Sequence, residues 1–491
     1  MRWLLALSMA SVAAPAPAAD ADWALGPADD CAAFDDPTLS QRLDQRTSSV
    51  ERPGNRAELL VDGVSAFERR RVSAREADVI LVKTFIFSED DAGRNIARQL
   101  ASRARAGAVV ILQYDLKGSL APDELIGSVD LSPGMNWLRD KPMLAELVDA
   151  GVLVVPTNVP RREAPLAGQL KRGVIERDRA AITPLQRITG LVNFDHYDHE
   201  KYWLTGRFDA EGRLVYEAIL GGMNLASEYA FGGTTKVDSV SGRAGWRDTD
   251  VALRGPVVND IVARYLDVLD FNLETALPEA LRAALNPPQP EAGEARARFV
   301  WNQPALGNDR QVERLYRELV RATPAGGTVR LASAYFTPGR RLNRPLERHL
   351  EEGRLAVVTN SPDSVDVALV TAASRARYES LLKQSTHAAL FEWVSRPELG
   401  AATLHSKTAS FGTCGPAIVG SANLDGQSSE HNSESVVMIR DPDFRREVDA
   451  MFDADLAASR RYTLEDVEAT PRGTRIWQRI VYTLGWRWLE G

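Results

Sequence analysis

The feature that most constrains this chain is a pair of His-x-Lys triplets, each followed by a Gly-x-x-Asn element. The first is His199-Glu200-Lys201 with Gly221 to Asn224, and the second is His405-Ser406-Lys407 with Gly420 to Asn423. The chain has 8 Lys beside 51 Arg and 6 His, so random placement would give only about 0.1 such triplets. The pattern predicts a duplicated chain in which each half contributes one triplet to a shared site.

The order of predicted elements repeats in the same way. A chain of 491 residues is longer than a single hydrophobic core usually serves, so two lobes are expected. Alternating strands and helices predict an α/β fold, with a mostly parallel or mixed sheet flanked by helices in each lobe. We expect strands at 77–88, 109–114 and 152–156 with helices at 90–106 and 143–150, then strands at 328–336, 355–359 and 388–394 with helices at 342–352 and 368–383.

The two ends and the middle of the chain set the expected boundaries. A charged start, an apolar run and Ala16-Pro17-Ala18 predict a signal peptide over residues 1–18, and hence export to the periplasm or the medium, with or without membrane association. A Pro-rich stretch predicts a linker at 287–296, between an N-terminal lobe (19–286) and a C-terminal lobe (297–470). The Trp- and Arg-rich segment 471–491 either contacts a membrane surface or docks on the protein.

The states of Cys31 and Cys414 admit two interpretations. In an oxidising compartment they could form a disulfide, and otherwise they are two buried thiols. The Arg-rich stretch 157–187 has little periodicity and is interpreted as an insertion, either an ordinary surface excursion or a cover for the site.

The doubled triplet suits cleavage of a phosphodiester. One histidine can attack phosphorus and form a covalent intermediate, while the other exchanges a proton with the leaving and entering oxygens. Lys and Asn side chains can hold the phosphoryl oxygens, and a carboxylate can orient each imidazole. No cluster in the sequence has convincing metal-ligand spacing, so no metal or other cofactor is expected. The candidate catalytic residues are His199, Lys201, Asn224, Asp248, His405, Lys407, Ser421, Asn423 and Glu434.

These motifs resemble the phospholipase D superfamily, and within it the bacterial cardiolipin synthases. Similar segments outside the triplets are Gly245 to Thr249, Arg254 to Val257, Thr359 to Ser361, Asp366 to Ala368, Gly420 to Asp425 and Asn432 to Glu434. The resemblance implies two lobes about a pseudo-two-fold axis, a single cleft without metal, and transfer of a phosphatidyl group through a phosphohistidine. It implies His199 as nucleophile and His405 as acid, or the same roles in reverse order. It implies a phospholipid substrate and a peripheral membrane contact.

The sequence departs from the superfamily pattern at three positions. Gly206 and Gly412 stand where the motif has Asp, and Gln427 stands where Arg is usual. Alternatives therefore remain: an exported phospholipase D hydrolase, a nuclease, or a degenerate member without activity. The net charge of -8 disfavours nucleic acid as the partner. His196 and His431 lie outside the motif and are interpreted as solvated or structural.

Overall fold

The computed structural model describes residues 31–119, 142–158, 161–162, 191–192, 196–273, 275–304 and 310–484. The predicted signal peptide, most of the stretch 157–187 and residues 485–491 lie outside these ranges. Residues 31–285 are called the first half below, and residues 295–484 the second half.

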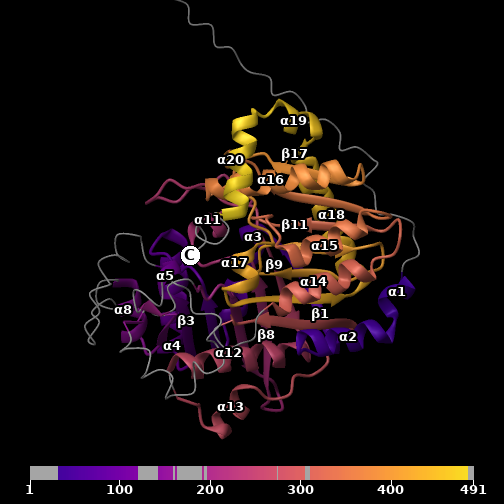
Figure 1. Cartoon of the computed structure of the whole chain (residues 1–491). Coiled ribbons are helices and arrows are strands. Elements are labelled where there is room, and N and C mark those ends of the chain that lie inside the picture. Colours follow the sequence, from indigo (N-terminus) through magenta and orange to yellow (C-terminus); the bar gives the residue numbers. More distant parts are fainter. Residues whose placement is uncertain are drawn as a thin grey trace, which may run out of the picture.

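One mixed sheet of 15 strands runs through both halves of the described chain (Figure 1). Its order is β17-β13-β12-β11-β14-β15-β16-β10-β1-β9-β8-β7-β2-β3-β4. The halves join where β1 (Glu51–Val61) pairs antiparallel with β10 (Ala295–Asn302). Outward from this junction each half repeats one pattern, in which three inner strands are antiparallel and the next three are parallel to each other. The predicted α/β fold with mixed sheets is confirmed, while the pseudo-two-fold axis stays a prediction.

The predicted strands and helices lie where hydrophobic periodicity placed them. The remaining strands of the first half are β2 (Val79–Thr84), β3 (Val109–Asp115), β4 (Leu153–Thr157), β7 (Tyr202–Phe208), β8 (Leu214–Gly221) and β9 (Thr249–Arg254), with a separate pair β5 (Arg161–Arg162) and β6 (Leu191–Val192). Those of the second half are β11 (Thr328–Ala332), β12 (Arg354–Asn360), β13 (Ala388–Trp393), β14 (Thr408–Phe411), β15 (Ala417–Gly420), β16 (Glu434–Arg440) and β17 (Ser459–Tyr462).

Helices flank the sheet. The first half has α1 (Cys31–Asp35), α2 (Pro37–Thr47), α3 (Asp62–Ala74), α4 (Asp91–Arg105), α5 (Leu116–Ser119), α8 (Pro142–Asp149), α11 (Ser227–Ala230), α12 (Val257–Leu273) and α13 (Glu279–Leu285). The second half has α14 (Gln311–Ala322), α15 (Arg340–His349), α16 (Ala368–Gln384), α17 (Gly426–Glu430), α18 (Pro442–Ala457), α19 (Leu464–Ala469) and α20 (Arg472–Leu484), with a short 3-10 turn at Pro397–Leu399.

The halves share a hydrophobic core at the junction. One cluster combines Ile261 and Tyr265 of α12 with Phe444 and Val448 of α18 and with strands from both halves. Each of these helices also reaches the other half's junction strand, because α12 packs on β10 and α18 packs on β1. Removal of this shared apolar surface from water holds the two halves as one body.

The segment between the halves is packed rather than free. Gln289 is buried, accepts a hydrogen bond from Tyr216 N (2.7 Å) and donates to Leu214 O (3.1 Å). Strand β10 begins at Ala295, inside the stretch expected to be a linker. The domain boundary at 287–296 therefore stays a prediction about chain organisation.

The two cysteines form a disulfide. Cys31 in α1 is bonded to Cys414, which lies between β14 and β15, with their Cα atoms 4.8 Å apart. The bond fastens the N-terminal helices to the second half, where Phe34, Leu39 and Leu43 join its core. The sequence left this pairing open, because the two residues are 383 positions apart.

The disulfide should stabilise the folded chain. Replacing Cys31 and Cys414 together with Ser is expected to lower the free energy of unfolding by roughly 2–4 kcal/mol, since the unfolded chain regains the freedom of a long closed loop. Urea unfolding of the oxidised protein measures the change. Added reductant should bring the wild type to the same midpoint and leave the variant unmoved, and equal midpoints without reductant would contradict the prediction.

Candidate active site

The two triplets lie at the boundary between the halves, and each half contributes one of them. Both stand just before a strand, because β7 begins at Tyr202 and β14 begins at Thr408. Each triplet thus ends one residue before its strand begins. Their backbone pairs across the halves instead, through the parallel bridges Asp198↔Ser433 and Arg247↔Leu404. Each bridge places a histidine from one half beside a carboxylate from the other.

Each histidine is bonded to a carboxylate of the opposite half. His199 Nδ1 lies 2.9 Å and 3.0 Å from the two carboxylate oxygens of Glu434. His405 Nδ1 lies 2.7 Å from Asp248 Oδ2. Where the carboxylate accepts the Nδ1 proton, the lone pair of the neutral ring resides on Nε2. Nε2 is thus the atom available for attack on phosphorus or for proton exchange.

The lysines and the serine of the motifs complete the cluster. Lys201 Nζ donates to His199 O (2.6 Å), and Lys407 Nζ donates to His405 O (2.5 Å) and lies 2.8 Å from His405 Nδ1. Ser421 Oγ donates to Glu434 Oε2 (2.5 Å), which helps to fix that carboxylate. The ammonium groups can hold phosphoryl oxygens as point charges.

The two asparagines border the cluster in different ways. Asn224 is fully buried, and its Oδ1 accepts from Ile86 N (3.0 Å), one residue after Phe85, whose ring packs on His199. Asn423 N donates to Ser428 Oγ (3.2 Å). Their expected contact with phosphate stays a prediction.

Burial sets the protonation of the site. It lowers the pKa of Lys201 to about 7 and of Lys407 to about 8, and it raises the pKa of Asp248 to about 6 and of Glu434 to about 8. Burial and then the nearby lysines hold the pKa of both motif histidines well below the usual value. Two neutral imidazoles among buried ionisable groups are typical of a catalytic site.

Comparison with known proteins agrees with this geometry. Residues 317–456 match the family model described as "Cardiolipin synthase, PLD-like domain". Over 441 residues the chain is 27% identical to cardiolipin synthase B of Escherichia coli O6:H1, covering 87% of this chain and 86% of that protein. It is also 27% identical over 433 residues to cardiolipin synthase A of Pseudomonas aeruginosa (strain LESB58), covering 87% and 72%.

The fold has a solved counterpart. The crystal structure of phosphatidylserine synthase from Haemophilus influenzae Rd KW20 matches with a TM-score of 0.61 and 13% identity, covering 92% of this chain and 99% of that one. At this identity the likeness shows the fold alone. Residues 317–456 thus match a PLD-like domain, and most of the chain is similar to cardiolipin synthases.

The two glycines that replace the superfamily's Asp have local structural causes. A side chain at Gly206 in β7 would meet Leu214 Cδ1 and Tyr216 Cε1 at 2.8 Å. Gly412 directly follows β14 and has φ +56°, the left-handed region that favours glycine. Gly206 lies within β7 and Gly412 directly after β14, and neither contacts the His–carboxylate pairs, so the departure leaves these pairs intact.

Sequence reasoning missed an aromatic layer around the histidines. Phe85 packs on His199 with 4.9 Å between ring centroids, and Tyr229 and Trp246 pack on His405 at 5.1 Å and 5.4 Å. The three rings limit the water that reaches the imidazoles. Tyr229 and Trp246 lie close in sequence to Asn224 and Asp248, but such proximity alone could not place them.

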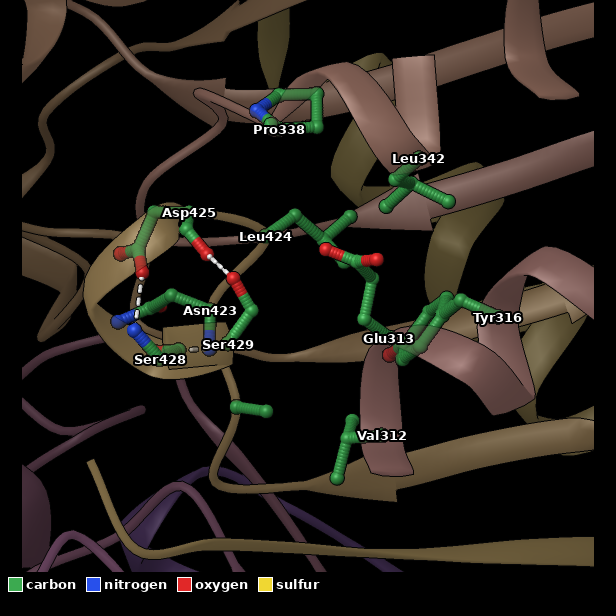
Figure 2. A pocket seen from close by; sticks show the side chains of 12 residues that line it. Val312, Glu313, Tyr316, Pro338, Leu342, Asn423, Leu424, Asp425, Ser428 and Ser429 are labelled. Atoms are coloured by element: carbon green, nitrogen blue, oxygen red, sulfur yellow. Dashed lines mark hydrogen bonds between the residues drawn. The ribbon is translucent and has the colours of Figure 1, made fainter. Parts of the chain in front are cut away.

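A pocket opens beside Asn423 (Figure 2), and neither motif histidine is among the residues that line it. Its walls are mainly apolar, and the side chain of Glu313 points into it from α14. Burial raises the pKa of that carboxyl group. The other lining residues are Val312, Tyr316, Pro338, Gly339, Leu342, Ala422, Leu424, Asp425, Ser428 and Ser429.

His196 and His431 lie together at the boundary of the halves, outside the catalytic pairs. His196 Nδ1 is 2.6 Å from His431 O, and the ring centroids are 6.1 Å apart. The solvated or structural role expected from the sequence stays a prediction. In the part of the chain that the structure describes, no group of three or more His, Cys, Asp or Glu residues could hold a metal ion.

Proposed function

We propose that this enzyme transfers a phosphatidyl group from a phospholipid to an alcohol, with hydrolysis as a side reaction. The observation that carries the proposal is the crossed pairing of two neutral histidines with carboxylates, beside two buried lysines. The similarity to cardiolipin synthases over 87% of the chain supports a phospholipid as the substrate.

The proposed reaction has two displacements at phosphorus. Nε2 of His199 attacks phosphorus, the bond to the leaving oxygen breaks, and His405 supplies a proton to that oxygen. An acceptor alcohol then gives its proton to His405 and attacks phosphorus, which breaks the nitrogen–phosphorus bond. A phosphodiester anion bound beside Lys201 and Lys407 would offset the charges that hold down the pKa of His405, so that this ring can carry the proton.

Product analysis tests the proposal. Purified protein incubated with phosphatidylglycerol in excess EDTA should yield cardiolipin, or a new phosphatidyl-alcohol when another alcohol is supplied, alongside phosphatidic acid. Mass spectrometry of the lipids measures the partition. Phosphatidic acid alone would reduce the function to a phospholipase, loss of activity on chelation would contradict the metal-independent mechanism, and degradation of plasmid DNA would favour the nuclease alternative.

We also propose that α20 contacts the membrane surface. The helix docks on α16 beside it (Figure 1), where Arg479 pairs with Glu379 at 2.8 Å. Its other face leaves Ile476, Trp477 and Ile480 exposed by 58%, 54% and 42%. An apolar strip with Trp and flanking Arg suits the interface of a bilayer. Among the described helices, none is long and apolar enough to cross a membrane.

Removing the apolar strip should weaken membrane binding. Replacing Ile476, Trp477 and Ile480 together with Ser is expected to lower binding to anionic phospholipid vesicles about tenfold or more, because most of the inserted apolar area is lost. Vesicle sedimentation measures the bound fraction. The matched control replaces the exposed Val64 and Val72 of α3 with Ser, and equal loss in both variants would contradict a specific role for α20.

The compartment remains a proposal as well. We place the working enzyme outside the cytoplasm, in contact with the lipid surface from the exported side. The Cys31–Cys414 disulfide supports this placement, since such bonds persist in oxidising compartments.

A further inference from the structure

Lys83 is a buried cation that touches the residues on both sides of His199. It lies in the otherwise largely apolar strand β2, with a side chain that is 1% exposed. Its Nζ forms an ion pair with Asp198 Oδ1 at 2.7 Å and donates a hydrogen bond to Glu200 Oε2. A single ammonium group thereby joins the two neighbours of the histidine.

Glu200 carries this contact further into the protein. Arg264 of α12 donates to both of its carboxylate oxygens at 2.9 Å, and Tyr202 Oη donates to Oε1 at 2.8 Å. Burial alone would raise the pKa of Glu200, but Arg264 and Lys83 lower it to about 2, so the carboxylate stays charged. Arg264 in turn donates to Gln303 Oε1 at 2.6 Å, just beyond β10.

The cluster contains two cations and two carboxylates, so its formal charges balance. Lys83, Asp198, Glu200 and Arg264 are all buried. A buried ion-pair cluster is a poor source of stability compared with well-packed apolar side chains, because its desolvation is unfavourable. Stability alone therefore does not account for four buried ionisable side chains beside and within the first triplet.

The second half-site lacks this support. His405 is flanked by Leu404 and by Ser406, whose hydroxyl lies 2.9 Å from Thr249 Oγ1. In sheet register Lys83 faces Tyr202, the residue after the first triplet, whereas Ala332 faces Thr408, the residue after the second. The half-sites share a motif but differ in what fixes their backbone.

We propose that Lys83 is a positioning residue for His199. By holding Asp198 and Glu200 it fixes the backbone on both sides of the ring, while Glu434 fixes the ring itself. The first half-site thereby gains the defined geometry that attack on phosphorus requires, since misplacement of a reacting atom by about 1 Å can reduce a rate about 10²-fold. This inference rests on the phosphatidyl transfer proposed above.

The test removes one cation and one carboxylate together, so that no buried charge is left unmatched. Lys83→Met with Asp198→Asn leaves Glu200 paired with Arg264, and so does a second variant, Lys83→Gln with Asp198→Asn, which keeps a polar side chain at position 83. We expect each folded variant to lose about 10²-fold in kcat with less than a twofold change in donor KM. Rapid acid quench should show phosphoenzyme formation slowed by the same factor.

The matched control is another ion pair, Arg375→Met with Glu392→Gln, in which Glu392 is buried, Arg375 is partly buried, and two hydrogen bonds of 2.9 Å join α16 to β13. It should shift the melting temperature comparably and leave kcat unchanged. A folded Lys83 variant with wild-type kcat and wild-type phosphoenzyme formation would overturn the inference, as would an equal loss in the control. If the wild-type enzyme itself fails to turn over phospholipid, the proposed function falls, and the inference falls with it.

Discussion

Replacing His199 with Asn should reduce phosphodiester turnover by at least about 10³-fold, and replacing His405 with Asn should do the same. Asparagine cannot form the covalent bond to phosphorus at position 199, nor exchange the proton at position 405. We expect the two rings to act in one reaction cycle, because each is held by a carboxylate of the opposite half. Initial rates with purified protein and phosphatidylglycerol measure the loss.

The His variants also separate the two roles. The His199 variant should form no acid-quenched phosphoenzyme, whereas the His405 variant should form it slowly and retain it. His387→Asn, which changes an exposed histidine, is the control and should keep the wild-type rate. Near wild-type turnover in either motif variant would refute a shared site.

Replacing Asp248 with Asn, or Glu434 with Gln, should reduce turnover by about 10²- to 10⁴-fold. An amide can donate to Nδ1, which stabilises the wrong tautomer and puts the proton on Nε2. Stability should not fall in parallel, because burial raises the pKa of both carboxyl groups and so opposes their charged forms. Kinetics and thermal unfolding on the same samples separate the two effects.

The coupling energy between two of these residues should depend on their contact in the folded protein rather than on their separation in sequence. In double-mutant cycles Asp248→Asn should be strongly non-additive with His405→Asn, since the two side chains act as one unit. Glu434→Gln should couple in the same way to His199→Asn. Asp443→Asn on the surface is the control, and additive losses within each cross-half pair would contradict the geometry.

Much of this architecture was predictable because its signals are local. Short continuous apolar runs indicate strands such as β2 and β12, and the repeated triplets mark His199 and His405 without any knowledge of the fold. Asp248 and Glu434 were found because they follow the motif asparagines. Their exchange of partners across the halves was not predictable, since it depends on the bridges beside Asp198 and Arg247.

The charged layer beneath the first triplet was missed for a physical reason. Glu200 is the variable middle residue of its triplet and reads as a solvated acid, and Arg264 is one of 51 arginines. Only the packing of α12 against β10 brings the two together. Lys83 offered a clearer indication of this layer. It is a lysine within an apolar strand, and a buried ammonium group requires oppositely charged or hydrogen-bonding partners.

The junction of β1 with β10 has a consequence for how lipid enters and leaves. A hinge between the halves would have to break the ladder from Glu51↔Arg298 to Asn55↔Ala295 and pull α12 and α18 off strands that they share. The two halves therefore cannot swing apart like jaws during each catalytic cycle. Entry and exit of the donor and acceptor must then depend on movements of side chains and loops around the site, while the sheet that aligns the histidines keeps its position.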